Sequence, residues 1–100
     1  MQNEQSDGIG LIAAERLRQV TVEGWDAEHD AGHRGFELSA AAECYLFAAR
    51  AILCPAPLQW PWSDEWWKPD ADPIRNLVKA GALIAAEIDR LQRTQKASNP

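Results

Sequence analysis

Two histidines and a glutamate have the spacing of a metal site on one face of a helix. His29, His33 and Glu37 follow one another at intervals of four residues, about one helical turn each. Two imidazoles and a carboxylate are ligands that zinc and similar ions accept. Two intervening glycines disfavour an unbroken helix, and Asp30 stands where the hydrolytic His-Glu-x-x-His motif has its glutamate. These three residues are therefore a candidate metal site without the full signature of a metallohydrolase.

The same stretch has the carboxylates of a helix–loop–helix calcium site but lacks its glycine. Asp26, Glu28, Asp30 and Glu37 occupy what would be positions 1, 3, 5 and 12 of the loop. Position 6 requires glycine for a sharp turn, and Ala31 occupies it. A solvated connection, whose carboxylates cap the next helix and pair with arginines, is the interpretation that the pattern favours. We therefore expect no cofactor to be needed for folding, with a bound divalent metal as the alternative.

Four of the five tryptophans fall within one ten-residue segment, Trp60–Pro69. This segment is not one long helix, because each of its two prolines lacks a backbone donor and pushes the preceding residue towards extended geometry. It predicts an extended start, a single helical turn over 64–67 with Ser63 as its N-cap, and a stop at the second proline. One tryptophan of the first pair and one of the second are expected to plug the groove between the second and third helices.

An exposed part of this segment would also make a binding surface. Indole rings stack on planar molecules, and neighbouring lysine and arginine side chains neutralise anionic groups, so a nucleotide-like ligand is one match. The same residue types form the hot spots of protein interfaces, so a protein partner is the other. The candidate ligand-binding residues are Trp60, Trp62, Trp66, Trp67, Lys68 and Arg75.

Three segments have the apolar spacing of helices. The predicted helices are 6–23, 36–54 and 72–94. Ser6 or Asp7 is suited to cap the first, and Asp72 followed by Pro73 is a strong start for the third. The second is apolar nearly all round, which is typical of a central, buried helix. The sequence therefore predicts a compact all-α three-helix domain over residues 1–100, with an acidic, glycine-rich connection, a tryptophan-rich connection and frayed termini.

The two outer helices each have an apolar stripe, which typically faces the core of a domain. The stripe of the first consists of Ile9, Ile12, Ala13, Leu17 and Val20. The stripe of the third consists of Ile74, Leu77, Val78, Gly81, Ile84, Ala85, Ile88 and Leu91.

Charge and cysteine spacing exclude several classes of function. The net charge is −5 and the basic residues are not clustered, which argues against non-specific binding to nucleic acids or to anionic membranes. No apolar run reaches the roughly 18 residues of a membrane span, and no secretory leader is recognised. Cys44 and Cys54 are ten residues apart on one predicted helix, about 15 Å and beyond disulfide reach. Free thiols are typical of the cytoplasm.

The enzyme alternative is a helical nucleotide pyrophosphohydrolase of the MazG type. That family holds magnesium with Glu-x-x-Glu and Glu-x-x-Asp motifs on neighbouring helices. The nearest carboxylates here are Glu37 with Glu43, six residues apart, and Glu87 with Asp89, two apart. Neither pair has the three-residue spacing that places both side chains on one helix face. The chain is similar to that family in helical character only.

A series of short motifs extends over most of residues 12–93. They are Glu15-Arg16-x-Arg18-Gln19, Glu23-Gly24-Trp25, His29-Asp30-x-x-His33, Glu37-Leu38, Trp60-Pro61-Trp62, Trp66-Trp67-Lys68-Pro69 and Leu77-Val78-Lys79-Ala80-Gly81-Ala82-Leu83-Ile84-x-Ala86-Glu87-Ile88. Together they resemble a family of small phage and prophage proteins. The resemblance carries over no catalytic residue. It implies an accessory protein of the host cytoplasm that binds a host protein or a nucleotide-like ligand. A metal-dependent nucleotide hydrolase and a purely structural protein are the alternatives.

Overall fold

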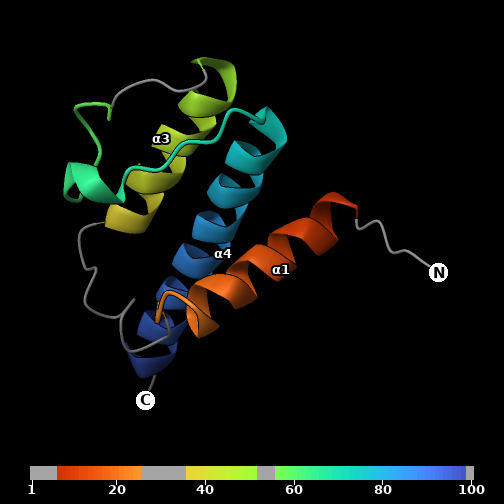
Figure 1. The fold of residues 1–100 in the computed structure, drawn as a ribbon. Coiled ribbons are helices and arrows are strands. Elements are labelled where there is room, and N and C mark those ends of the chain that lie inside the picture. Colours follow the sequence, from red (N-terminus) through yellow and green to blue (C-terminus); the bar gives the residue numbers. More distant parts are fainter. Residues whose placement is uncertain (1–6, 26–35, 52–55, 99–100) are drawn as a thin grey trace.

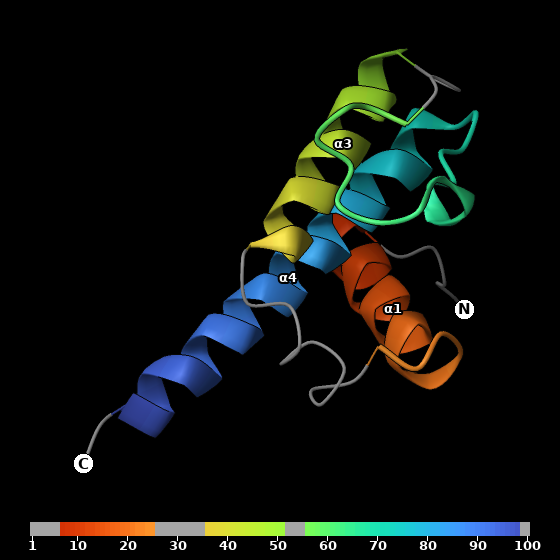
Figure 2. The ribbon, with the colours of Figure 1, turned by 90° about the vertical axis from the view of Figure 1, so that its left-hand side faces the viewer.

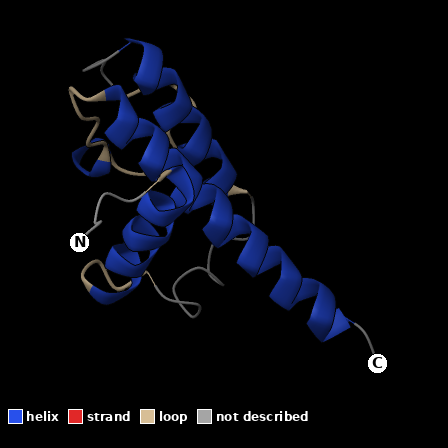
Figure 3. Cartoon of the chain, turned by 90° about the vertical axis from the view of Figure 1, so that its right-hand side faces the viewer, coloured by secondary structure: helices blue, strands red, loops and turns tan. Residues whose placement is uncertain are grey.

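All regular structure in the described part of the chain is helical. The computed structural model describes residues 7–25, 36–51 and 56–98. Its elements are α1 (Gly8–Thr21), α3 (Glu37–Ala51), the short 3-10 helix η1 (Asp64–Trp66) and α4 (Pro73–Ser98). Figures 1 and 3 show these elements with no strand among the described residues. The predicted all-α, three-helix fold is confirmed. None of the described helices combines the length and the apolar character that a membrane span requires.

The helix starts follow the predicted capping residues. The Asp7 carboxylate accepts a hydrogen bond from the Gly10 amide at 2.9 Å, and the Asp72 carboxylate accepts one from the Ile74 amide at 2.9 Å. The end of α4 differs from the prediction, because the helix continues past residue 94 to Ser98. Residues 95–97 are Gln, Lys and Ala, all of which favour a helix, so nothing in this stretch stops it.

The core lies between α3 and α4, which run antiparallel. Ser39, near the start of α3, donates to Glu87, whereas the Ala48 carbonyl, near its end, accepts from Asn76. Small side chains allow the two helices to approach closely, and the tryptophan segment covers one side of the pair. The main core cluster consists of Leu38, Ala41, Ala42, Cys44, Tyr45, Trp60, Ala80, Leu83 and Ala86.

Helix α1 packs on α4 away from this core cluster. Figures 2 and 3 show α1 diverging from the α3–α4 pair. The contact depends on Gly81, because a Cβ atom there would lie only 2.5 Å from the Cδ1 atom of Ile12. Among its described residues, α1 buries the polar Glu15 and Gln19, and it leaves the aliphatic Ile9 exposed. Helix α1 is therefore attached through a face that combines the aliphatic Ile12 with the buried polar Glu15 and Gln19.

The predicted core-facing role of the apolar stripes is largely wrong. On α1, Leu17 is exposed as well as Ile9. On α4, only Val78 among the large apolar members of the predicted stripe is buried. The face of α4 that is buried against the alanine-rich surface of α3 lies beside the predicted stripe. The buried residues of that helix are Asn76, Val78, Ala80, Ala82, Leu83, Ala86, Glu87 and Arg90.

Candidate functional site

The tryptophan segment folds into the predicted single turn between extended flanks. The amides of Trp66 and Trp67 donate to the carbonyls of Ser63 and Asp64 at 2.9 and 3.0 Å, which forms η1, and Trp67 is already extended. Ser63 occupies the N-cap position, but its side chain makes no capping hydrogen bond. The Ser63 carbonyl accepts instead from the indole N–H of Trp60 at 3.1 Å. The turn is thus fastened to the indole that it covers.

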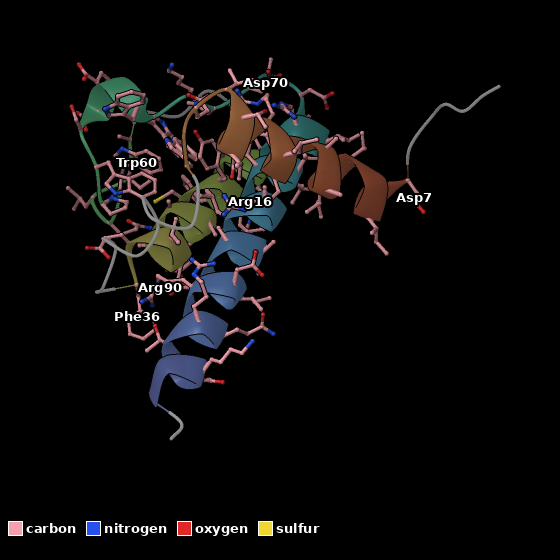
Figure 4. All side chains as sticks on the ribbon, turned by 90° about the horizontal axis from the view of Figure 1, so that it is seen from below. Asp7, Arg16, Phe36, Trp60, Asp70 and Arg90 are labelled. Atoms are coloured by element: carbon pink, nitrogen blue, oxygen red, sulfur yellow. The ribbon has the colours of Figure 1, made fainter. Side chains whose placement is uncertain are left out.

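Trp60 is the centre of an aromatic cluster. It is 8% exposed, and its ring lies 5.8 Å from Tyr45, 5.2 Å from Trp62 and 4.9 Å from Trp67 between centroids, each in an edge-to-face arrangement. Figure 4 places Trp60 on the side of the molecule away from Asp7. Trp67 packs on the core, whereas Trp66 remains 47% exposed. The second pair therefore divides as predicted, with Trp67 packed on the core and Trp66 exposed, whereas in the first pair Trp60 is buried and Trp62 also packs against the core.

A charged cluster on α1 borders these rings. The Glu15 carboxylate, 3% exposed, accepts hydrogen bonds from Arg18 through both Nε and Nη2 at 2.9 Å and another from Arg75 of α4. Arg18 also donates through Nη1 to Glu23 at 2.9 Å. Burial by itself raises the pKa of Glu15, but the hydrogen bonds and positive charges of the two arginines outweigh it and hold that pKa below its ordinary value.

Two lysines line the opposite wall. The Lys79 ammonium donates to the Lys68 carbonyl at 2.6 Å and lies 5.4 Å from the centre of the Tyr45 ring. Burial lowers the pKa of Lys79, and the positive charge of Arg75 lowers it further. The Lys68 ammonium lies 5.6 Å from the Trp66 ring, and its amide donates to the Tyr45 hydroxyl at 3.2 Å. These contacts fix the end of the tryptophan segment to α3 and α4.

The rings and charges surround a small, open pocket with a cavity volume of about 40 Å³. On its α1 side, the side-chain oxygen of Gln19 is buried and has no hydrogen-bond partner among the described residues, while its amide nitrogen donates to Glu15 at 3.3 Å. A buried acceptor without a donor is unfavourable unless a ligand or a water supplies one. The residues that line the pocket are Glu15, Arg18, Gln19, Glu23, Trp25, Tyr45, Trp60, Trp62, Trp66, Lys68, Lys79 and Leu83.

Most of the candidate ligand-binding residues lie at this pocket. Trp60, Trp62, Trp66 and Lys68 line it. The other two candidates, Trp67 and Arg75, stand behind it: Trp67 packs against Tyr45 and Trp60, and Arg75 holds Glu15. Helix α1 and Trp25 also line the pocket, and neither was among the candidates predicted from the sequence. The one available signal was the cluster of polar residues at 15, 18 and 19, which helical spacing brings to one side of the helix.

The metal hypotheses fall mainly on residues outside the described ranges. His29 and His33 lie there, and so do Asp26, Glu28 and Asp30. Glu37 is the first residue of α3 and is half-buried. Within the described ranges, no three His, Cys, Asp or Glu side chains converge in a way that would hold a metal ion.

The MazG-type carboxylates do not form an acidic cluster in the described structure. Glu87 is paired with Arg90 at 2.7 Å and accepts from Ser39 at 3.0 Å, and Glu43 is exposed. The Arg90 hydrogen bond lowers the pKa of Glu87 despite its burial. Figure 4 shows Arg90 beside Phe36, and the guanidinium lies 5.8 Å from that ring. The ion pair lies within α4, and its contacts with Ser39 and Phe36 join the start of α3 to α4, which is a structural role. Cys44 is buried in the core, and Cys54 lies outside the described ranges.

Comparison of the chain with protein-family models, with curated proteins and with solved structures finds no match. The function is therefore argued from the pocket itself.

Proposed function

We propose that this protein binds a small ligand with a planar ring and an anionic group, of the nucleotide class, in the pocket between α1 and the tryptophan segment. The observation that carries the proposal is the combination of aromatic walls, surplus positive charge and a buried acceptor without a donor. The cavity itself, about 40 Å³, is smaller than most small-molecule sites, so the ligand would lie across its open mouth against the exposed indole surface.

The aromatic walls supply a stacking surface. Trp62 is tilted against Trp25 at 6.2 Å, and Trp66 leaves nearly half of its surface in solvent beside them. A planar ring inserted here would cover indole faces, and each such stacking contact contributes about 1–3 kcal/mol to nucleobase binding. Gln19 lines the pocket, and a rotation of its side chain would bring its oxygen to an N–H group at the edge of that ring and supply the hydrogen bond that this oxygen lacks within the described structure.

The charges favour an anion. Lys68, Lys79 and Arg18 line the pocket with two carboxylates, and Arg75 lies directly behind one of them. The local excess of positive charge contrasts with the net charge of −5 on the whole chain. A phosphate near Lys79 would stabilise an ammonium that burial otherwise disfavours. Ligand binding of this kind is consistent with the phage-type accessory role, in the host cytoplasm, that the resemblance implies.

Titration of the intrinsic tryptophan fluorescence tests the proposal. Adenosine and guanosine monophosphate are the probes, with the free nucleosides and inorganic phosphate as separate arms. We expect saturable quenching by a monophosphate, and at least about tenfold weaker binding of each fragment alone, because each engages one half of the site.

Lys79→Met should weaken binding of the monophosphate about tenfold or more, and Gln19→Leu should act in the same direction. Lys96→Met, which removes an exposed lysine near the end of α4, is the matched control and should change nothing. Absence of saturable binding by either monophosphate, or an equal loss in the Lys79 and Lys96 variants, contradicts the proposal.

A further inference from the structure

A row of aliphatic side chains on α4 faces solvent. The exposed fractions are 59% for Ile74, 48% for Leu77, 44% for Ile84 and 51% for Ile88. At 100° per residue, these four positions fall within about a quarter of the helix circumference. With Gly81 and Leu91, they recur at alternating intervals of three and four residues, which is the spacing at which helices interdigitate.

This row is free of charge over its whole length. The residues on that side of α4 are Pro73, Ile74, Leu77, Gly81, Ile84, Ile88, Leu91, Gln92 and Gln95. The seven charged residues of the helix all lie elsewhere on its surface. A helix face that remains in water typically carries charged residues, whereas the centre of a protein interface is depleted of them. The composition is therefore that of a face that becomes covered.

Helix α1, which contacts this row at Gly81, also exposes aliphatic side chains. Ile9, Ala13 and Leu17 follow at intervals of four residues and are exposed, and Ile12 on the same helix contacts Gly81 in the middle of the α4 row. The six large aliphatic side chains of the two rows together expose on the order of 600 Å². A standard interface buries about 800 Å² on each partner, and the alanine, glycine and glutamine neighbours add to the six aliphatic side chains.

We propose that this face, formed by the exposed rows of α1 and α4, pairs with the same face of a second copy of the chain about a two-fold axis. Self-pairing requires a surface that does not repel itself, and a charge-free row meets this condition although each chain carries a net charge of −5. Ile12 of α1 lies against Gly81, so the isoleucine and leucine side chains on either side of that contact are the ones available to interdigitate with those of the second copy. The available area is close to what such a dimer needs.

This pairing leaves the ligand pocket open. Lys79 lines the pocket and Ile84 belongs to the exposed row, and five residues of helix separate them by about 140° around the α4 axis. The interface and the pocket thus use different faces of the same helix. Dimerisation and ligand binding are therefore tested independently.

Sedimentation equilibrium of the full chain over micromolar concentrations tests the pairing. We expect a mass of about twice 11.1 kDa for the unaltered protein. The double variant Ile84→Glu/Ile88→Glu should sediment as a monomer, with self-association weakened at least hundredfold, because it brings four carboxylates into one apolar contact. Its helical circular dichroism should be retained, since both side chains are exposed in the single chain.

Two further variants separate the interface from general effects. Arg93→Glu changes the charge of the same helix on a different, exposed face and should leave the dimer intact. Ile84→Asn/Ile88→Asn adds no charge and should still weaken pairing, which covers the case in which the glutamates disturb the fold. The proposal is overturned if the unaltered chain is monomeric throughout the range, since another partner would then cover the face. It is equally overturned if the double glutamate variant, still folded, remains dimeric.

Discussion

The carboxylate of Glu15 is the contact that holds α1 to α4, and replacing it tests the account of the charged cluster. Glu15→Gln keeps the size of the side chain and removes its charge. In the unaltered protein the Glu15 carboxylate binds Arg18, three residues away on α1, and Arg75, sixty residues away on α4. The contact therefore joins two helices. In the variant, Arg18 and Arg75 face each other without the intervening negative charge, and the glutamine amide group presents a donor towards them.

The expected loss follows from the number of bonds and their exposure. Three arginine hydrogen bonds reach a carboxylate that is almost fully buried, and each bond to a charged group contributes about 1.5–3 kcal/mol. The two arginine side chains are 36–37% exposed, so water recovers part of that energy. We expect the free energy of unfolding to fall by about 2–4 kcal/mol, somewhat below the cost of breaking a fully buried pair. In a domain of this size that lowers Tm by roughly 10–25 °C.

The pH dependence makes the test specific to charge. The pKa of Glu15 in the folded protein lies below its ordinary value of 4.5, so its contribution is present above about pH 4.5 and is lost as the pH falls through the folded pKa. The stability difference between the unaltered protein and Glu15→Gln should therefore narrow as the pH falls. The lowered pKa of Glu87 affects both proteins and cancels in the difference.

Urea unfolding followed by circular dichroism, from pH 7 to about pH 3, measures this difference. Glu65→Gln, an exposed carboxylate on η1, is the control and should cost less than about 0.5 kcal/mol. A Glu15→Gln loss no larger than that of the control refutes the structural account. A loss that stays constant down to the lowest pH refutes its electrostatic origin.

Two further predictions concern packing, and both are measured by denaturant unfolding. Trp60→Ala should lower the free energy of unfolding by about 3–5 kcal/mol, because it empties the centre of the aromatic cluster. Trp66→Ala, at an exposed position, should lower it by less than about 1 kcal/mol. Equal losses in the two variants would contradict the central position of Trp60. Gly81→Ala should destabilise the protein by about 1–3 kcal/mol, although alanine favours a helix by about 1 kcal/mol, because the new methyl group meets Ile12. Adding Ile12→Ala should make the Gly81→Ala change less costly, and a strictly additive double variant would exclude this contact.

The sequence was sufficient where short-range chemistry decides the structure. Asp7 and Asp72 start helices because their carboxylates satisfy amides that the first turn leaves unpaired, and this requires no knowledge of the rest of the fold. The same holds for the tryptophan segment, where two prolines restrict the backbone. Its division into buried and exposed indoles also follows locally, because the neighbouring Trp66 and Trp67 point in different directions from one turn.

The sequence was insufficient where a distant partner decides which face of a helix is buried. The periodicity of α1 indicates an inward aliphatic stripe, but Arg75, sixty residues from Glu15, supplies the charge that makes burial of Glu15 favourable. No pattern within α1 contains that information. On α4, the alanine-rich surface of α3 selects the face that carries Leu83 and Ala80, and it leaves the more aliphatic row outside.

Helix α1 buries its polar residues and exposes its aliphatic ones, opposite to what its apolar stripe predicts. This orientation connects the two proposals. A helix that buried Ile9 and Leu17 against α4 would turn Glu15 and Gln19 away from the tryptophan segment, and the pocket would lose its buried acceptor. The observed orientation places Glu15 and Gln19 at the pocket. The Arg16 guanidinium also donates a hydrogen bond to the carbonyl of Trp25, another lining residue, at 3.1 Å. Its consequence is an uncovered aliphatic face, which is unfavourable in water for a single chain. In the proposed dimer a second copy covers that face, so the orientation of α1 that builds the proposed pocket also creates the surface proposed for pairing.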